Sequence, residues 1–561
     1  MLTKPRRARS ATRRAHRRLA GVGCALVVCA WASAAQADAW HHGHRGAELR
    51  PGDLLVSTSD YVPADVTAGV TQLPPGCATA PTGSCATAVV SGDDFPAVFN
   101  NDSVDSFFGV DTPVYLDELT PWGEHVGTIR VPTNEFVTSF SSKSELALNL
   151  SPEGRYVSFM GYDAQPGVVD SSNANTPGVL DPGNGDVGPY YLVVAQLDRW
   201  GHFTFTRTNA YSGDNGRAAI TNDENGQDLV YTAGNAGQSG SPPANVVQSA
   251  GAQFVTPSQQ PEADQTPGAP TPLGSFNITE LGYPLDKATK DNNFRAIAIH
   301  DNVIYYTKGS GGNGINTVYF VDTTGKACPN GVGLPVPGAQ LPTSPPTFTV
   351  ENFGTAKKPN NGLVPTNMCI LKGFPTNLAK STTNFPFGMW FANDHTLYVA
   401  DEGAGDNTFA NGQYVNATAA AQPNAGLEKW VFDATAQQWK LAYTLQNGLD
   451  LGQPYTVPGY PTGLNTGPGG TMGPWSPATD GLRALTGRVG PDGIATIWAV
   501  TSTVSGSGDN GADPDKLVAT VDAVNAAAPA PWERFWTVRD ARFGQVLRGV
   551  SFTPGTESDR W

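Results

Sequence analysis

The stretch "VIYYTKGSGGNGINTVYFVD", residues 303–322, holds the pattern that decides the fold. It consists of an apolar run, a break rich in glycine and asparagine, a second apolar run and a closing Asp. β-Branched and aromatic residues fill both runs, as is typical of strands, and the residues between them favour a loop. The stretch therefore predicts two strands of one antiparallel sheet, joined by a loop.

Related versions of this pattern recur along the chain. A further apolar run and a tight turn precede each version, as in "AIAIHDN" at 296–302, so the unit is strand, turn, strand, long loop, strand, turn, strand. Four antiparallel strands that recur every ~60 to 100 residues, with turn signals between them, indicate the blade of a β-propeller. The first strands of five units are predicted to begin near residues 146, 218, 296, 389 and 484.

The two ends of the chain supply a sixth blade. "GVSFTPG" (549–555) stands alone at the C-terminus, and three strand patterns without partners occupy 53–61, 112–123 and 124–132. Pairing them would remove two open sheet edges, which are otherwise prone to aggregation. We therefore predict an all-β fold, a six-bladed β-propeller closed by N-terminal strands that pair with a C-terminal strand. Seven blades are the alternative, because the Pro-rich stretch 240–275 has room for two more strands.

Three blade motifs carry a resemblance to known proteins: "SPEGRYVSF", "DHTLYVAD" and "VYFVDTTG". They resemble the broad group of extracellular propellers that includes lactonases and NHL-type and YncE-like repeats. The resemblance covers most of the chain and implies a propeller, which by itself implies no activity. Because some six-bladed lactonases hold a calcium ion in the channel, the resemblance makes a calcium-dependent hydrolase of lactonase or esterase type an alternative function.

The N-terminus reads as a secretory signal peptide over residues 1–37. Eight basic residues without an acid precede the apolar run "LAGVGCALVVCAWASA", and small residues before Asp38 suit cleavage. That run is too short to span a bilayer, and no second spanning run follows. We expect a secreted or periplasmic protein with a disordered, histidine-containing tail at 38–51 and a single propeller domain at 52–561.

The charge of the chain limits its partners. The sequence has 35 basic and 50 acidic residues, and without the eight basic residues of the leader the net charge is −23. Such a chain repels polyanions, which argues against nucleic acid and anionic membranes as partners. We expect a monomer without a membrane span.

The cysteines predict disulfide bonds. Four follow the leader: Cys77, Cys85, Cys328 and Cys369. An even number in an exported chain favours two disulfides, most simply Cys77–Cys85 and Cys328–Cys369, although three pairings are open. Neither spacing is that of a zinc site.

Loop lengths distinguish one face of the propeller from the other. Turns between first and second strands, and between third and fourth strands, are tight. Long insertions connect second to third strands and one blade to the next, and they include the Pro-rich insert 240–275 and the Gly/Pro-rich insert 451–480. These two kinds of loop emerge on the same face of a propeller, so recognition is expected on that face.

An arginine followed by a small residue stands at the start of four first strands: Arg217, Arg295, Arg483 and Arg548. First strands line the channel, so these arginines are expected to ring its mouth on the long-loop face, and Glu145 lies near the same level. A guanidinium ring suits a carboxylate or phosphate, and the leading hypothesis is a binding propeller for a small anionic molecule or glycan. In the alternative, each arginine pairs with an acid of its own loop, such as Asp214 or Asp480, and fastens that loop.

An acidic loop supplies a separate metal candidate. Asp401, Glu402 and Asp406 in "DEGAGDN" offer oxygen ligands for calcium, although the EF-hand spacing is absent and solvated turn residues are the alternative. The sequence holds no credible Ser-His-Asp set, phosphate loop or dinucleotide motif. The hydrolase alternative therefore has no assigned catalytic residues, and a structural envelope or matrix protein is a third alternative.

Overall fold

The computed structural model divides the chain into two units, Met1–Gly43 and His44–Trp561, and the residues that it describes lie in the second. Those residues are 48–61, 72–73, 86–87, 109–168, 171–177, 189–223, 229–235, 251–257, 275–276, 293–309, 315–328, 331–343, 368–377, 383–460, 462–465, 473–507 and 510–557. The predicted signal peptide and the predicted Cys77–Cys85 bond lie outside the described residues.

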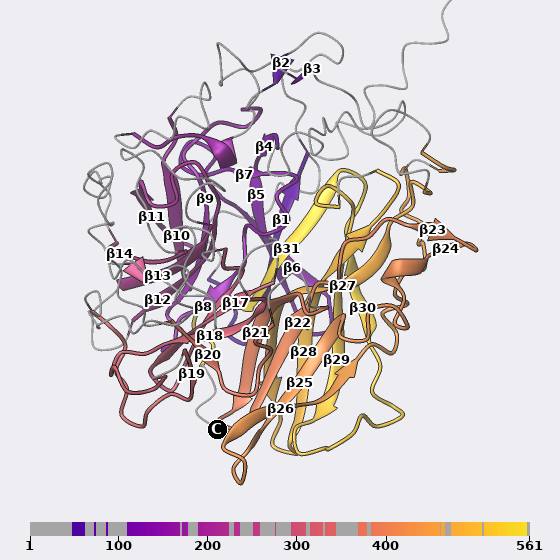
Figure 1. The fold of residues 1–561 in the computed structure, drawn as a ribbon. Helices are drawn as coiled ribbons and strands as arrows, with labels where there is room; N and C mark the ends of the chain where they lie inside the picture. Colours follow the sequence, from indigo (N-terminus) through magenta and orange to yellow (C-terminus); the bar gives the residue numbers. More distant parts are fainter. Residues whose placement is uncertain are drawn as a thin grey trace, which may run out of the picture. The chain divides into compact units, whose positions relative to one another are not determined.

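Six sheets are arranged as the blades of a β-propeller (Figure 1). From the inner strand outward, blade 1 contains β31 (Gln545–Phe552), β1 (Leu54–Asp60), β5 (Val114–Leu119) and β6 (His125–Arg130). Blade 2 contains β8 (Asn149–Leu150), β9 (Tyr156–Tyr162), β10 (Leu192–Asp198) and β11 (Phe203–Thr208). Blade 3 contains β12 (Gly216–Asn222), β13 (Leu229–Gly234), β14 (Ala252–Val255) and β15 (Ser275–Phe276).

The second half of the chain builds the other three blades. Blade 4 contains β16 (Ile297–His300), β17 (Val303–Lys308), β18 (Thr317–Val321), β20 (Met368–Leu371) and β19 (Val332–Gly333). Blade 5 contains β21 (Pro386–Asn393), β22 (Thr396–Asp401), β25 (Gly426–Asp433) and β26 (Gln438–Leu445). Blade 6 contains β27 (Ala478–Val489), β28 (Ile494–Val504), β29 (Lys516–Ala523) and β30 (Trp536–Asp540).

Several short elements lie outside the six blade sheets. They are the pairs β2 (Gln72–Leu73) with β3 (Ala86–Thr87), β4 (Asp111–Thr112) with β7 (Thr138–Ser139), and β23 (Phe409–Ala410) with β24 (Gln413–Tyr414), and the 3₁₀ turns η1 (Ser171–Asn173) and η5 (Val415–Ala417). Within the described ranges, no helix has the length and apolar character needed to cross a membrane.

Closure of the ring follows the prediction from the chain ends. The C-terminal strand β31 pairs antiparallel with β1, from Leu54 opposite Phe552 to Asp60 opposite Gln545, and β5 and β6 continue the sheet outward. The stretch 303–322 forms β17 and β18, which pair antiparallel within blade 4. The six-bladed prediction is confirmed.

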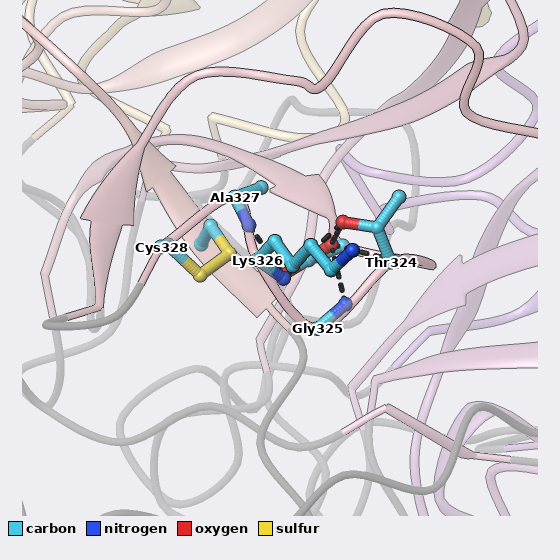
Figure 2. The surroundings of a disulfide bond; sticks show 7 residues. Thr324, Gly325, Lys326, Ala327 and Cys328 are labelled. Atoms are coloured by element: carbon cyan, nitrogen blue, oxygen red, sulfur yellow. Dashed lines mark hydrogen bonds between the residues drawn. A yellow bond between two sulfur atoms is a disulfide. The ribbon is translucent and has the colours of Figure 1, made fainter.

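Blade 4 contains a feature that local patterns did not predict. Its outermost strand, β19, pairs parallel with β20, and the Cys328–Cys369 disulfide ties the chain just before β19 to β20 (Figure 2). Next to it, the Asp322 carboxylate accepts hydrogen bonds from the backbone N–H groups of Thr324, Gly325 and Ala327 and so fixes the turn. This predicted disulfide is present.

A ring of small residues brings the six inner strands close together. We call it the collar: Ala147, Ala218, Ala296, Gly388, Ala484 and Gly549. Ala147 and Ala218 form a parallel bridge between neighbouring inner strands. A Cβ atom on Gly549 would overlap the carbonyl oxygen of Leu146, and one on Gly388 would overlap that of Arg483. Backbone therefore packs on backbone between neighbouring inner strands at the collar, which marks one level along the channel.

Candidate functional site

The four predicted arginines stand on inner strands or directly before them, each one residue ahead of the collar. Arg217 is in β12, Arg483 in β27 and Arg548 in β31, while Arg295 lies two residues before β16. All four are at most 5% exposed. In blade 5 the corresponding position is Phe387, whose ring lies 5.9 Å from the guanidinium carbon of Arg295. The side chains therefore surround the channel at one level and are buried there.

Residues 140–146, which we call the mouth segment, extend across the channel on this side of the collar. Arg548 of blade 1 donates hydrogen bonds to the carbonyl oxygens of Phe140 (2.8 Å) and Ser142 (3.0 Å). Arg295 of blade 4 donates to the Ser144 hydroxyl. The mouth segment leads into blade 2, so its contacts with blades 1 and 4 place it over the channel.

The Glu402 carboxylate lies at the centre of the charged groups in the mouth. Its Oε2 atom is 3.2 Å from Nε of Arg483 and 3.9 Å from Nζ of Lys143. Burial opposes ionisation of Glu402, but the charges of Lys143, Arg295 and Arg483 outweigh it and lower the pKa of this carboxyl. One carboxylate is thus surrounded by three cations from three different parts of the chain.

Lys143 is the member of this cluster that reaches solvent. Its side chain is 37% exposed, whereas those of Arg483 and Glu402 are 4% exposed. Although Glu402 opposes the change, burial and the positive charges of Arg483 and Arg295 lower the pKa of Lys143. The sequence analysis did not identify Lys143 as a candidate. The feature that could have identified it is a single lysine among serines, directly before a predicted first strand.

Asp214 and Asp480, the acids of the loops that carry Arg217 and Arg483, accept hydrogen bonds from other groups, although the charge of Asp214 also favours ionisation of Arg217. Asp480 accepts hydrogen bonds from the backbone N–H of Gly405 (2.7 Å) and from Nε2 of Gln422 (2.8 Å), while Arg483 contacts Glu402. Asp214 accepts a hydrogen bond from the Asn235 side chain. Arg483 therefore takes its acid from the neighbouring blade.

Arg217 retains donors without acceptors. Its Nη1 donates to the carbonyl oxygen of Phe294 (2.9 Å) and to the Asn293 side chain, which joins blade 3 to blade 4. Its Nε and Nη2 atoms are buried without a hydrogen-bond partner, as is Nε of Arg295. Burial and the charge of Arg295 lower the pKa of Arg217.

Glu145 has a full set of donors within the protein. It accepts hydrogen bonds from the Thr138 hydroxyl (2.8 Å), the Ser139 N–H (3.2 Å), Nδ2 of Asn215 (3.1 Å) and the Tyr162 hydroxyl. Burial raises the pKa of this carboxyl. These contacts fasten the mouth segment to blade 2 and leave Glu145 no side facing a ligand.

The three proposed calcium ligands are not gathered in one place. Asp401 accepts hydrogen bonds from the backbone N–H groups of Phe385 and Gly403, Glu402 faces cations, and Asp406 is exposed. Across the described residues, the one group of three potential metal-ligating side chains is Asp322 with the two disulfide-bonded cysteines. The geometry gives calcium at this loop no support.

Buried carboxyls near the mouth make stability depend on pH. Burial raises the pKa of Asp401, Asp480 and Asp515, each to about 7. Between about pH 4 and pH 7 the folded protein holds protons that the unfolded chain releases, so stability is lost as the pH rises through 7. We expect the free energy of unfolding in urea to fall from pH 5 to pH 7.

A variant isolates one of these groups. Asp480→Asn should make the decline of the free energy of unfolding with pH shallower, by up to about 1.4 kcal/mol per pH unit, because one proton fewer is taken up on folding. In Asp433→Asn the slope should not change, since hydrogen bonds from Lys440 and from backbone N–H groups lower the pKa of that exposed carboxyl. A wild-type stability that rises over this range would contradict the assignment.

Comparisons with known proteins assign this chain to no family. No family model matches the chain, and no curated protein sequence matches it. Among solved structures, the chain is similar to one assigned as a 6-phosphogluconolactonase from Bacteroides fragilis, with 10% identity, a TM-score of 0.31, and coverage of 90% of this chain and 98% of that one. Likeness at this level carries no argument about activity.

Proposed function

We propose that this protein is an exported binding propeller that holds a small anionic molecule, a carboxylate- or phosphate-bearing sugar or acid, at the channel mouth on its long-loop face. The observation that carries the proposal is the cluster of Lys143, Arg295 and Arg483 around the single carboxylate of Glu402. Three cations thus converge on one carboxylate in a strongly acidic protein, and Asp480 is a further acid whose charge acts on Lys143.

The cluster has the chemistry of an anion site. Glu402 occupies the position that a ligand carboxylate would take on Arg483, and charge-assisted hydrogen bonds of this kind are stronger than neutral ones. The partly exposed side chain of Lys143 provides the open side on which a second anion can bind. Arg217 and Arg295 have buried nitrogen atoms without partners, which add positive potential beneath it. A polar ligand with one acidic group and several hydroxyls suits this mouth.

The test is a calorimetric titration of the full chain with glucuronate, galacturonate, citrate and glucose 6-phosphate, with glucose as the uncharged control. We expect at least one anion to bind, and binding to weaken as salt is added. Lys143→Met should weaken that binding about tenfold or more, which corresponds to ~1.4 kcal/mol. The change should lower the melting temperature only slightly, because Arg295 and Arg483 still compensate the charge of Glu402.

The matched control is Lys440→Met. Lys440 forms an exposed ion pair with Asp433 at the outer edge of blade 5, away from the inner strands. The Lys440→Met protein should bind the anion as the wild type does. Equal affinity of Lys143→Met and wild type, or no binding of any acid in the panel, would remove the basis of the proposal.

A further inference from the structure

The half of the channel on the other side of the collar is a hollow. It is a cavity of about 390 Å³, within the size range of small-molecule sites. Six buried apolar side chains, one from each blade, contribute to its wall: Leu148, Ile220, Ile297, Met389, Leu485 and Phe552. Each of them follows a collar residue in the chain, whereas the arginines precede the collar. The hollow therefore opens on the tight-turn face, opposite the mouth segment.

The hollow also offers hydrogen-bonding groups. Each inner strand is the end strand of its sheet, so its second edge faces the channel. Asn149, Thr486 and Ser551 lie among the lining residues between the apolar side chains. Buried backbone N–H and C=O groups need partners, which in a channel are water or a ligand. An entirely apolar occupant would leave these groups unsatisfied.

Charged groups occur at the rim and are mixed in sign. The titratable lining residues are His300, Asp394, His395, Arg488 and Glu557. Nε2 of His300 lies 3.1 Å from Oδ1 of Asp394, and the His300 ring stacks on Phe391 with 4.3 Å between ring centroids. No charged side chain is among the six that form the apolar wall. The guanidinium carbon of Arg488 lies 5.8 Å from the centre of the Phe552 ring, but Arg488 is exposed at the rim. A charge buried deeper among the six apolar side chains would be costly.

We infer that the hollow is a second binding site, separate from the anion site, for a small uncharged molecule. Its ligand would have a mainly apolar body of the size of an aromatic ring system and one hydrogen-bonding group. The volume of about 390 Å³ admits a body of two or three aromatic rings. The apolar wall supplies affinity through burial of apolar surface, and the strand edges orient the polar group.

The experiment uses N-phenyl-1-naphthylamine, a neutral probe that fluoresces in apolar surroundings, titrated into the full chain. We expect saturable binding of one probe per chain and a higher melting temperature at saturation. Neutral 1-naphthol should displace the probe, whereas charged 1-naphthoate and the anions of the mouth site should not. These displacement measurements need no variant.

Two substitutions fill the hollow from different blades. Thr486→Trp acts from β27 and Ala298→Trp from β16, and both positions line the cavity and are partly exposed. Each should weaken probe binding at least tenfold. Thr204→Trp, at an exposed position on the outer strand β11, is the matched control and should bind as the wild type does. Melting temperatures check that the variants fold.

Three results would overturn the inference. They are the absence of saturable one-to-one probe binding to the wild type, unchanged affinity in folded Thr486→Trp or Ala298→Trp, and displacement by naphthoate as effective as by naphthol. Because these measurements do not involve Lys143, their outcome does not depend on whether an anion binds at the mouth.

Discussion

Lys429→Met is expected to lower the free energy of unfolding by about 3–5 kcal/mol. Lys429 lies in β25 of blade 5, and its Nζ is 2.8 Å from Oδ2 of Asp522 in β29 of blade 6. Both side chains are completely buried. Removing one partner leaves the other charge in the protein interior without compensation, which costs far more than a surface pair contributes.

The surroundings of this pair show why the interior tolerates it. Asp522 accepts hydrogen bonds from the hydroxyls of Tyr443 (2.6 Å) and Tyr398, and Lys429 donates to the carbonyl oxygens of Ala523 (2.6 Å) and Ala526 (3.1 Å). The network joins two blades through fully engaged groups. Loss of the ammonium would leave two carbonyl oxygens and a carboxylate exposed to an interior without a cation.

Urea unfolding of three variants separates charge burial from packing. Lys440→Met removes the exposed pair with Asp433 in the same blade and should change the free energy of unfolding little, because exposed ion pairs contribute little to stability. The double variant Lys429→Met, Asp522→Leu should recover much of the loss, because no unpaired charge remains. If Lys429→Met were no less stable than Lys440→Met, the buried pair would not be a significant link between the blades.

The propeller could be predicted from sequence because its signals are local. Alternating apolar runs and tight turns identify strands, and an unmatched strand at each chain end identifies the closure. The parallel strand β19 had no such signal, since two residues pair with a strand more than 30 residues later only after the chain has folded. The Lys429–Asp522 pair depends in the same way on the packing of separate blades.

The candidate site could likewise be predicted from sequence only in part. The position of the arginines follows from their place before first strands, but their partners do not follow from nearby acids. Arg483 contacts Glu402, 81 residues earlier, in preference to Asp480, because the end of β22 in blade 5 packs beside β27. The hollow on the tight-turn face could not be predicted, since its volume depends on how six side chains from six blades meet.

Arg548→Met is expected to lower the free energy of unfolding by about 3–5 kcal/mol and to loosen the mouth segment. Its guanidinium donates to the carbonyl oxygens of Phe140, Ser142 and Gly511 and lies 3.6 Å from Oδ2 of Asp515. Removing it leaves several buried acceptors without a donor and Asp515 without its counter-charge. Hydrogen exchange of residues 140–146 should accelerate in the variant, together with a lower urea midpoint.

The comparison that decides the role of Arg548 is with Arg542→Met. Arg542 lies three residues before the same strand and forms an ion pair with Asp60. Its side chain is 44% exposed, so its loss should lower the free energy of unfolding by less than about 1 kcal/mol. Arg548→Lys should be intermediate, because the charge remains but the planar fork of donors is lost. An Arg548→Met protein as stable as Arg542→Met, with weakened anion binding, would instead make Arg548 a direct ligand contact. The expected result makes it the anchor that holds the mouth segment and Lys143 in place for the ligand.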